Sequence, residues 1–267
     1  MAYKYKHVIM AGIDGAGVFF HKAKAPLIRS MFEKGAGADP ALTVFPTESA
    51  QCWCTMLTGI MPEEHGLTMD NIGEIEYKGK AEHPDIFALI RKAHPEAKLA
   101  SFAHWSPINT GIVDDGIGVV KDTGKDDYLM ERACVYVKAE RPEFLFIHFD
   151  SVDDHGHGYG YGSEKYLAQL DLVDGYTARV FEAAAEAGIA DDTLFIVTTD
   201  HGGINGSHGG WSDEEKYVFF VMTGKTVRKC AIPEMNVREI PAIIAYALGI
   251  PGVADADGKD PGRLFTV

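Results

Sequence analysis

Short apolar runs alternate with amphipathic segments along most of the chain. Runs of about four to eight apolar residues predict buried strands, and apolar residues that recur every three or four positions predict helices. Strands that alternate with helices indicate an α/β fold, with a mostly parallel central sheet and helices on both of its faces. The strands are expected at residues 7–13, 41–45, 98–103, 144–149, 193–199 and 217–222, and the helices at 25–34, 49–58, 84–93, 126–139, 164–187 and 237–248.

The chain is expected to form one domain over residues 1–267. Its 267 residues, of which 46% are apolar, suffice for one buried core, and neither a repeat nor a linker divides them. Two stretches, near 71–80 and 105–125, fit neither period. We expect them to be small excursions that lie over a functional site.

Charge and cysteine content narrow the class of partner and the compartment. The formal net charge of −14 disfavours nucleic-acid duplexes and anionic membranes. An anionic substrate, such as a small phosphorylated molecule, could bind such an acidic protein only where the charge is locally positive. Bound metal ions would supply that positive charge. The four cysteines are scattered, no apolar signal segment or membrane span is evident, and a cytoplasmic location with reduced thiols is expected. An oligomer is compatible with the sequence.

Acidic residues follow three of the predicted strands. Asp14 follows the first strand, Asp150 and Asp153 follow the strand at 144–149, and Asp200 follows the strand at 193–199. The carboxyl ends of strands in an open α/β sheet meet at one crevice, where ligands bind. We therefore expect these residues to share a site although they are far apart in the chain.

Two histidine-rich segments provide candidate metal ligands. Residues 149–160 read FDSVDDHGHGYG, in which Asp153 and His157 are four positions apart and fall on one face of a helical turn. Carboxylate and imidazole groups together suit Zn²⁺ or a similar ion. Asp150 and Asp154 are alternatives to Asp153, and His155 is a weaker candidate than His157. The second segment contains Asp200-His201-Gly-Gly and then Ser207-His208-Gly-Gly.

The candidate nucleophile is Ser49. It stands where the N-cap of the helix at 49–58 belongs, and an N-cap is the commonest role of serine there. The same position places a hydroxyl beside the backbone N–H groups and the positive end of the helix dipole, which favour a phosphate. A metal ion at the hydroxyl would make it a nucleophile without a histidine base. Thr47 is the alternative.

Four segments resemble the alkaline phosphatase superfamily, most closely its type I phosphodiesterase/nucleotide pyrophosphatase branch. They occur in the family's order and span most of the chain. The segments are Ile13-Asp14-Gly15; Phe45-Pro-Thr-Glu-Ser49 through Gly59 with Pro62-Glu-Glu-His65-Gly66; Asp153-x-x-Gly-His157-x-x-Gly160; and Thr199-Asp200-His201-Gly202 with His208-Gly209.

The resemblance implies two zinc sites, with Mn²⁺ as an alternative metal. One site would use Asp14, Ser49, Asp200 and His201, and the other would use Asp153, His157 and His208. The two ions would lie about 4 Å apart, with the substrate phosphorus between them. Ser49 would attack in line, which would give a phosphoseryl intermediate. The resemblance therefore implies that the protein acts as a phosphodiesterase/nucleotide pyrophosphatase.

The chain departs from this pattern at several points. The branch usually has threonine where Ser49 stands, and its substrate-binding asparagine is matched only by Asn71, which is offset by one position. No arginine lies next to Ser49, and the chain is shorter than typical members. Phosphomonoesterase or phosphonate hydrolase activity is therefore an alternative. Less favoured are a sulfatase, because the C/S-x-P/A-x-R motif is missing around Ser49, and a non-catalytic metal-binding module.

Overall fold

Eight strands form one sheet in the order β4-β3-β5-β1-β6-β7-β2-β8. The computed structural model describes residues 4–75, 82–251, 253 and 258–266. β7 runs antiparallel to both of its neighbours, and the other adjacent strands pair in parallel. The mostly parallel sheet is confirmed. The strands are β1 (His7–Ile13), β2 (Ala36–Leu42), β3 (Leu99–Ala103), β4 (Val119–Asp122), β5 (Phe144–Phe149), β6 (Thr193–Thr198), β7 (Tyr217–Thr223) and β8 (Cys230–Ala231).

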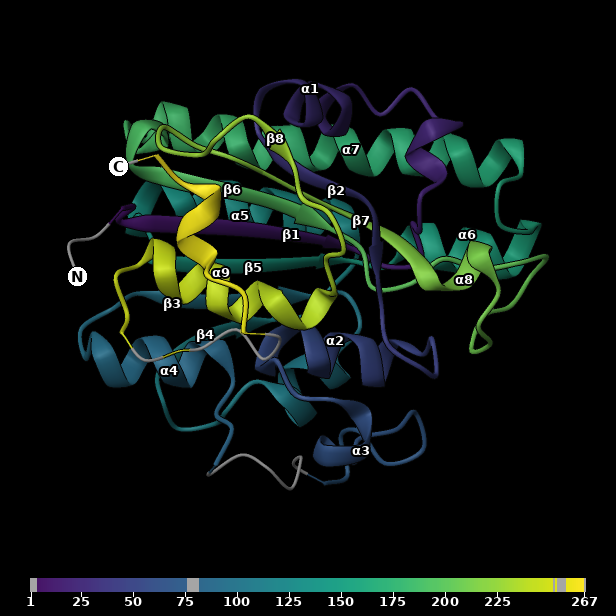
Figure 1. Cartoon of the computed structure of the whole chain (residues 1–267), viewed down its shortest axis with the longest axis horizontal. Helices are drawn as coiled ribbons and strands as arrows, with labels where there is room; N and C mark the ends of the chain where they lie inside the picture. Colours follow the sequence, from purple (N-terminus) through teal and green to yellow (C-terminus); the bar gives the residue numbers. More distant parts are fainter. Residues whose placement is uncertain (1–3, 76–81, 252, 254–257, 267) are drawn as a thin grey trace.

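Helices cover both faces of the sheet, as the alternating pattern predicted (Figure 1). Two separate groups of buried apolar side chains, one on each face, tie the helices to the strands. On one face lie α2 (Ser49–Thr58), α4 (Ile86–Ala93) and α9 (Ile240–Ala247); on the other lie α1 (Pro26–Lys34), α5 (Asp126–Glu140) and α7 (Glu164–Glu186). Shorter helices are α3 (Pro62–His65), α6 (Ser151–Tyr159) and α8 (Asp213–Lys216).

The second predicted strand is displaced in the structure. The apolar run at 41–45 favoured a strand there, whereas β2 spans Ala36–Leu42 and contains Gly37, Asp39 and Pro40. The pairing of β2 with β7 shifts register between Ala38 and Ala41, and Asp39 and Pro40 are exposed at this irregularity. A strand with small and polar residues at a bulge carries no simple apolar pattern, so its position is not predictable from hydrophobicity alone.

The stretch at 105–125 is partly regular. It contains a π-helical turn (Ile108–Ile112) and the edge strand β4, whose side chains are half-buried or exposed. An edge strand with so little burial lacks the alternation of apolar and polar residues from which a strand is predicted. Of the other predicted excursion, residues 71–75 form turns, and residues 76–80 lie outside the described residues.

Four adjacent parallel strands end at the same edge of the sheet. β3, β5, β1 and β6 lie side by side, and the backbone N–H of Asp14 donates to the carbonyl of Phe149 across the ends of β1 and β5 at 2.8 Å. Figure 1 shows α6 and α8 beyond this edge. The sheet therefore brings the acidic residues after β1, β5 and β6 together, as the strand-end pattern predicted.

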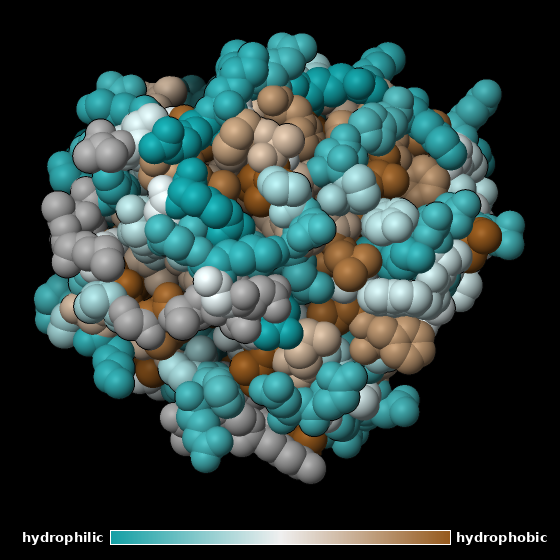
Figure 2. Space-filling view, viewed as in Figure 1, coloured by the Kyte–Doolittle hydropathy of each residue, from teal (hydrophilic) through white to brown (hydrophobic). Residues whose placement is uncertain are grey.

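The surface is mixed in character. The face drawn in Figure 2 shows hydrophobic residues scattered among hydrophilic ones, outside the grey atoms. In the part of the chain that the structure describes, none of the helices has both the length and the apolar content needed to cross a bilayer.

Candidate metal centre

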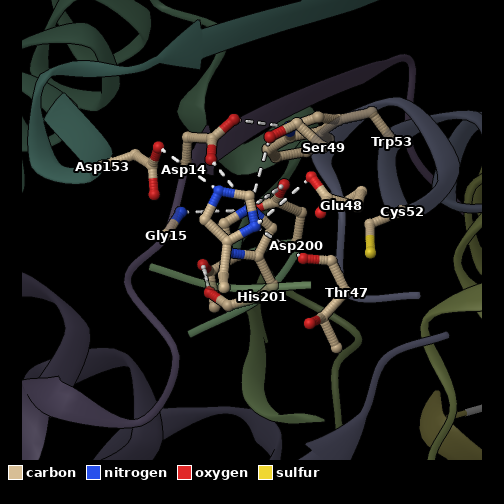
Figure 3. Close-up of polar contacts among 12 residues, drawn as sticks. Asp14, Gly15, Thr47, Glu48, Ser49, Cys52, Trp53, Asp153, Asp200 and His201 are labelled. Carbon is tan, nitrogen blue, oxygen red and sulfur yellow. Dashed lines mark hydrogen bonds and ion pairs between the residues drawn. The ribbon is translucent and has the colours of Figure 1, made fainter. Parts of the chain in front are cut away.

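The first cluster of site residues comes from three separate elements. Asp14 follows β1, Asp200 and His201 follow β6, and Ser49 begins α2. His201 Nε2 lies 3.2 Å from Ser49 Oγ. The same nitrogen lies 3.4 Å from Asp14 Oδ1 and 3.3 Å from Asp200 Oδ2. Figure 3 shows these side chains converging where the parallel strands end.

Each carboxylate of this cluster has one oxygen anchored by hydrogen bonds and one that accepts no hydrogen bond from the described residues. Asp14 Oδ2 accepts hydrogen bonds from Trp53 Nε1 at 2.8 Å and from His148 Nε2 at 2.9 Å. Asp200 Oδ1 accepts one from the Gly15 backbone N–H at 3.1 Å. Asp14 Oδ1 and Asp200 Oδ2 are buried and accept no hydrogen bond from any described residue. Because an unpaired buried carboxylate oxygen is costly, these two oxygens mark a place for a cation.

The second cluster joins α6 to the loop that follows β6. His157 Nε2 lies 3.1 Å from Asp153 Oδ2, one helical turn away. From the loop, His208 Nε2 lies 3.2 Å from His157 Nε2 and 4.0 Å from Asp153 Oδ2. The structure therefore brings together the three side chains that the resemblance grouped. The side chain of His157 is 46% exposed, so this cluster is reached from solvent.

Glycine has a steric role beside Asp153. The hydroxyl of Tyr161 donates a hydrogen bond to Asp153 Oδ1. A Cβ atom at Gly156 or at Gly203 would lie 2.5 Å from the Tyr161 ring, so both positions must lack a side chain for the ring to reach Asp153. Despite glycines at 156 and 158, α6 is helical through Tyr159, and it ends at Gly160, whose φ is +89°.

The three histidines are held in the same tautomer. The Nδ1 atoms of His157, His201 and His208 lie 2.9, 2.9 and 2.7 Å from backbone carbonyl oxygens. Because a carbonyl oxygen only accepts, each Nδ1 carries a proton, and Nε2 is left as the ring nitrogen that faces the site and could bind a metal. Histidines that ligate metals are usually fixed through their other ring nitrogen in this way.

The donor set fits two divalent ions. Nε2 of His157 and Nε2 of His208 face each other at 3.2 Å, and two buried carboxylate oxygens accept no hydrogen bond from any described residue. Carboxylate oxygen and imidazole nitrogen are ligands that zinc accepts. Within each of two groups the ligand atoms lie within 4.8 Å of one another: Asp14, Asp200 and His201 form one group, and Asp153, His157 and His208 form the other.

Electrostatics also favour positive charge at the site. Burial, followed by repulsion between carboxylates, raises the pKa values of Asp14 and Asp200 well above the usual range. Burial opposes ionisation of Asp153 too, but its hydrogen bond with His157 holds the pKa of Asp153 below the usual range. The same contact raises the pKa of His157 to about 9, whereas burial lowers the pKa of His208 to about 4. The site thus gathers more negative charge than its own side chains neutralise.

Thr47, the alternative nucleophile, has its hydroxyl fully engaged. Thr47 Oγ1 donates to the carbonyl of Gly210 and accepts from the N–H of Gly209, both at 2.9 Å. The carbonyl of Thr47 receives the Nδ1 proton of His208 at 2.7 Å. Thr47 is fully buried, whereas Ser49 is 7% exposed and touches His201. Ser49 stays the predicted nucleophile, and the contacts of Thr47 hold the loop that carries His208.

The variant Thr47→Val should weaken metal binding without removing catalysis. It keeps the shape of the side chain but leaves the Gly209 N–H without its acceptor. We expect the affinity of the second cluster for Zn²⁺ to fall about 10- to 100-fold, the effect typical of a lost outer-shell partner. At saturating Zn²⁺, turnover should recover to within about tenfold of wild type. Loss of turnover at full metal content would instead identify Thr47 as the nucleophile.

Three residues with contacts in the site were not singled out from the sequence. Trp53 and His148 anchor Asp14, and Glu48 lies 3.7 Å from His208, measured from Oε2 to Nδ1. For two of them, Trp53 and His148, the sequence contains a feature that could have indicated the role. Trp53 is four positions after Ser49 and therefore on the same face of α2, and His148 is a polar residue in an otherwise apolar strand. The pKa of His148 is lowered by burial to about 4, so it acts as a neutral donor.

The remaining candidates lie beside the two clusters rather than in them. The amide of Asn71 donates to the carbonyl of Gly66 and accepts from the N–H of Thr68, so both of its ends close its own loop. A role for Asn71 in substrate binding stays a prediction. His155 bonds through Nδ1 to the carbonyl of Ser151, within its own helix. Asp150 and Asp154 form a third group with His104, and Asp150 also groups with Asp14 and His148 at the edge of the first cluster.

The comparisons with known proteins agree with this fold. Residues 8–85 and 92–221 match the family model of type I phosphodiesterase/nucleotide pyrophosphatase. The match covers most of the chain, which therefore belongs to this branch of the alkaline phosphatase superfamily.

Curated relatives share 23% identity with the chain. Ectonucleotide pyrophosphatase/phosphodiesterase family member 3 of Rattus norvegicus aligns over 182 residues, which are 60% of this chain and 20% of that protein. Venom phosphodiesterase 2 of Crotalus adamanteus aligns over 193 residues, which are 66% of this chain and 24% of that protein. The alignments thus span about a fifth to a quarter of the length of these relatives.

Solved structures share the fold at low identity. Murine ectonucleotide pyrophosphatase/phosphodiesterase 5, an inactive variant in complex with AMP, superposes with a TM-score of 0.80 at 14% identity and covers 98% of this chain and 100% of that one. A 2-O GAG sulfatase superposes with a TM-score of 0.75 at 12% identity and covers 97% of this chain and 74% of that one.

Proposed function

We propose that the protein is a two-metal phosphoric ester hydrolase that acts as a phosphodiesterase/nucleotide pyrophosphatase. In this proposal Ser49 is the nucleophile. The observation that carries the proposal is the convergence of two unpartnered buried carboxylate oxygens and a histidine lone pair around the Ser49 hydroxyl. Family membership supports the same reaction class.

Seven side chains would hold the metals, which we propose to be zinc. When bound, two such ions would lower the pKa of a coordinated hydroxyl and stabilise charge on the phosphoryl and leaving oxygens. Because Asp14 and Asp200 are anchored through their second oxygens, both ligands are fixed before substrate arrives. Asp14, Ser49, Asp200 and His201 would form one site, and Asp153, His157 and His208 the other.

Ser49 is placed to attack phosphorus. It is the first residue of α2, so its hydroxyl lies beside free backbone N–H groups that favour a phosphoryl oxygen. The new bond would join Ser49 Oγ to phosphorus as the bond to the leaving oxygen breaks, which gives a phosphoseryl intermediate. Water would later cleave that intermediate and restore the Ser49 hydroxyl.

A substrate with an aromatic or nucleoside group suits the surface near these loops. Phe45 and Trp211 are 56% and 41% exposed and pack edge to face, with ring centroids 5.9 Å apart. Phe45 precedes Ser49 by four residues, and Trp211 follows His208 by three. An exposed aromatic pair can bind a base or another planar group. The AMP seen in the murine relative is in keeping with this proposal.

Other activities of the same site stay as alternatives. A phosphomonoesterase or phosphonate hydrolase could use the same side chains. The sulfatase that shares the fold makes sulfate ester cleavage worth a test, although the sulfatase motif is absent around Ser49. A cytoplasmic location also stays a prediction; all four cysteines are free thiols in the structure.

A rate comparison with Zn²⁺ or Mn²⁺ present tests the proposal. The substrates are bis-p-nitrophenyl phosphate, p-nitrophenyl phosphate, p-nitrophenyl thymidine monophosphate and p-nitrophenyl sulfate. We expect the two diesters to be cleaved with the higher kcat/KM. A higher value for p-nitrophenyl phosphate would assign a monoesterase. Cleavage of none of the four by the metal-loaded protein would support a non-catalytic binding module.

A further inference from the structure

We propose that Glu48 selects against doubly charged phosphate monoesters and so directs the site toward singly charged diesters. This inference rests on the proposed function, because it concerns which phosphate esters reach Ser49. It adds a specificity residue to a site whose other members serve metal binding or attack.

Glu48 is held close to both clusters. It is the N-cap residue of α2, directly before Ser49, yet its side chain makes no capping hydrogen bond. Its carboxylate instead turns toward the loop that carries His208, with Oε2 3.7 Å from His208 Nδ1. Figure 3 shows Glu48 beside Ser49 and His201, at the centre of the site.

A glycine makes room for this carboxylate. A Cβ atom at Gly209 would lie 2.3 Å from Glu48 Oε1, and Gly209 has a φ of +107°, which side chains rarely adopt. The side chain of Glu48 is 30% exposed, so it is neither sealed in the core nor free in solvent. The backbone around Gly209 therefore fixes a negative charge at the entrance to the site.

Glu48 adds a negative charge to a site whose carboxylate ligands would already offset most of the charge of the metal ions. The three carboxylates among the proposed ligands would offset three of the four positive charges of two divalent ions, and an ionised Glu48 would add a further negative charge beside them. The basic side chains within 4.0 Å of the carboxylates of Asp14, Asp153, Asp200 and Glu48 in the described structure are all histidines. No arginine or lysine among the described residues pairs with these carboxylates to restore positive charge.

An added substrate charge is therefore penalised. Above pH 7 a phosphate monoester carries two negative charges, because its second pKa is near 6, whereas a diester carries one. A carboxylate directly before Ser49, the proposed nucleophile, repels a bound dianion more strongly than a monoanion. At the effective dielectric of a partly exposed site, one such charge changes the ratio of the two rates by about tenfold.

The test is the variant Glu48→Gln, which removes the charge and keeps the shape. The kcat/KM values for p-nitrophenyl phosphate and bis-p-nitrophenyl phosphate are measured at pH 8 with Zn²⁺, for wild type and variant. We expect the monoester-to-diester ratio to rise about tenfold. Glu214→Gln is the matched control, because Glu214 is an exposed carboxylate of α8 outside both clusters, and its ratio should stay unchanged.

A binding measurement separates charge selection from other effects. Calorimetry with orthophosphate and with diethyl phosphate should show orthophosphate binding to Glu48→Gln strengthened about tenfold, and diethyl phosphate binding changed much less. Two bound metals per chain should remain. An unchanged ratio, a metal lost from the variant, or an equal shift in Glu214→Gln would each overturn the inference. If the wild-type protein cleaves neither ester, the proposed function itself fails, which is a distinct result.

Discussion

Replacing Ser49 with alanine is expected to lower turnover of bis-p-nitrophenyl phosphate by at least about 10³-fold, while two metal ions stay bound. The reason is that Asp14, Asp200 and His201 remain in place when the hydroxyl is removed, and each is fixed by contacts that do not involve Ser49. Steady-state rates and metal content by mass spectrometry measure both parts. Only the attacking atom is lost.

The control for this variant is Ser106→Ala. Ser106 is an exposed serine of the loop after β3, outside both clusters, and its loss should leave the rate within about twofold of wild type. If Ser49→Ala kept most of its activity with full metal content, the nucleophile would have to be another group. Thr47 would then be tested next, despite its engaged hydroxyl.

Replacing His208 with alanine should remove one metal ion and keep the other. His208 contributes to the cluster with Asp153 and His157, and that cluster would be left with two ligands. The cluster around His201 keeps all of its ligands. We expect about one Zn²⁺ per chain after dialysis and a fall in kcat/KM on the order of 10² or more, because two-metal catalysis depends on both ions.

His155 provides the matched control for His208. It is a histidine of the same region whose Nδ1 bonds to a carbonyl of its own helix, and it belongs to neither cluster. His155→Ala should therefore retain two metals and near wild-type activity. Full stoichiometry in His208→Ala would contradict the assignment of His208 as a ligand.

The sequence was most informative where a strand is buried on both faces. β1, β5 and β6 are mostly apolar, and Asp14, Asp153 and Asp200, which follow them in the chain, come together at the shared edge. These strand ends are predictable because polar residues follow each apolar run, although Asp14 and Asp200 are themselves buried. β2 was misplaced because its bulge exposes Asp39 and Pro40, and β4 was missed because an edge strand needs little burial.

The supporting contacts of the site could not be read from the chain. The contact of Glu48 with His208 depends on how the loop after β6 folds back over α2. The hydrogen bonds of Trp53 and His148 to Asp14 depend on three elements meeting at one carboxylate. The amide of Asn71 closes a local loop, which no spacing rule would indicate. Residue types and spacing predict which groups could act, whereas tertiary packing decides what holds them.

A metal titration of the chelated protein tests the two-metal account most directly. Zn²⁺ is added in steps to metal-free protein, and binding by calorimetry and hydrolysis of bis-p-nitrophenyl phosphate are followed on the same samples. We predict that binding saturates at two Zn²⁺ per chain and that full activity appears only as the second site fills. Full activity in the metal-free protein, or saturation of both signals at one Zn²⁺ per chain, would contradict the account.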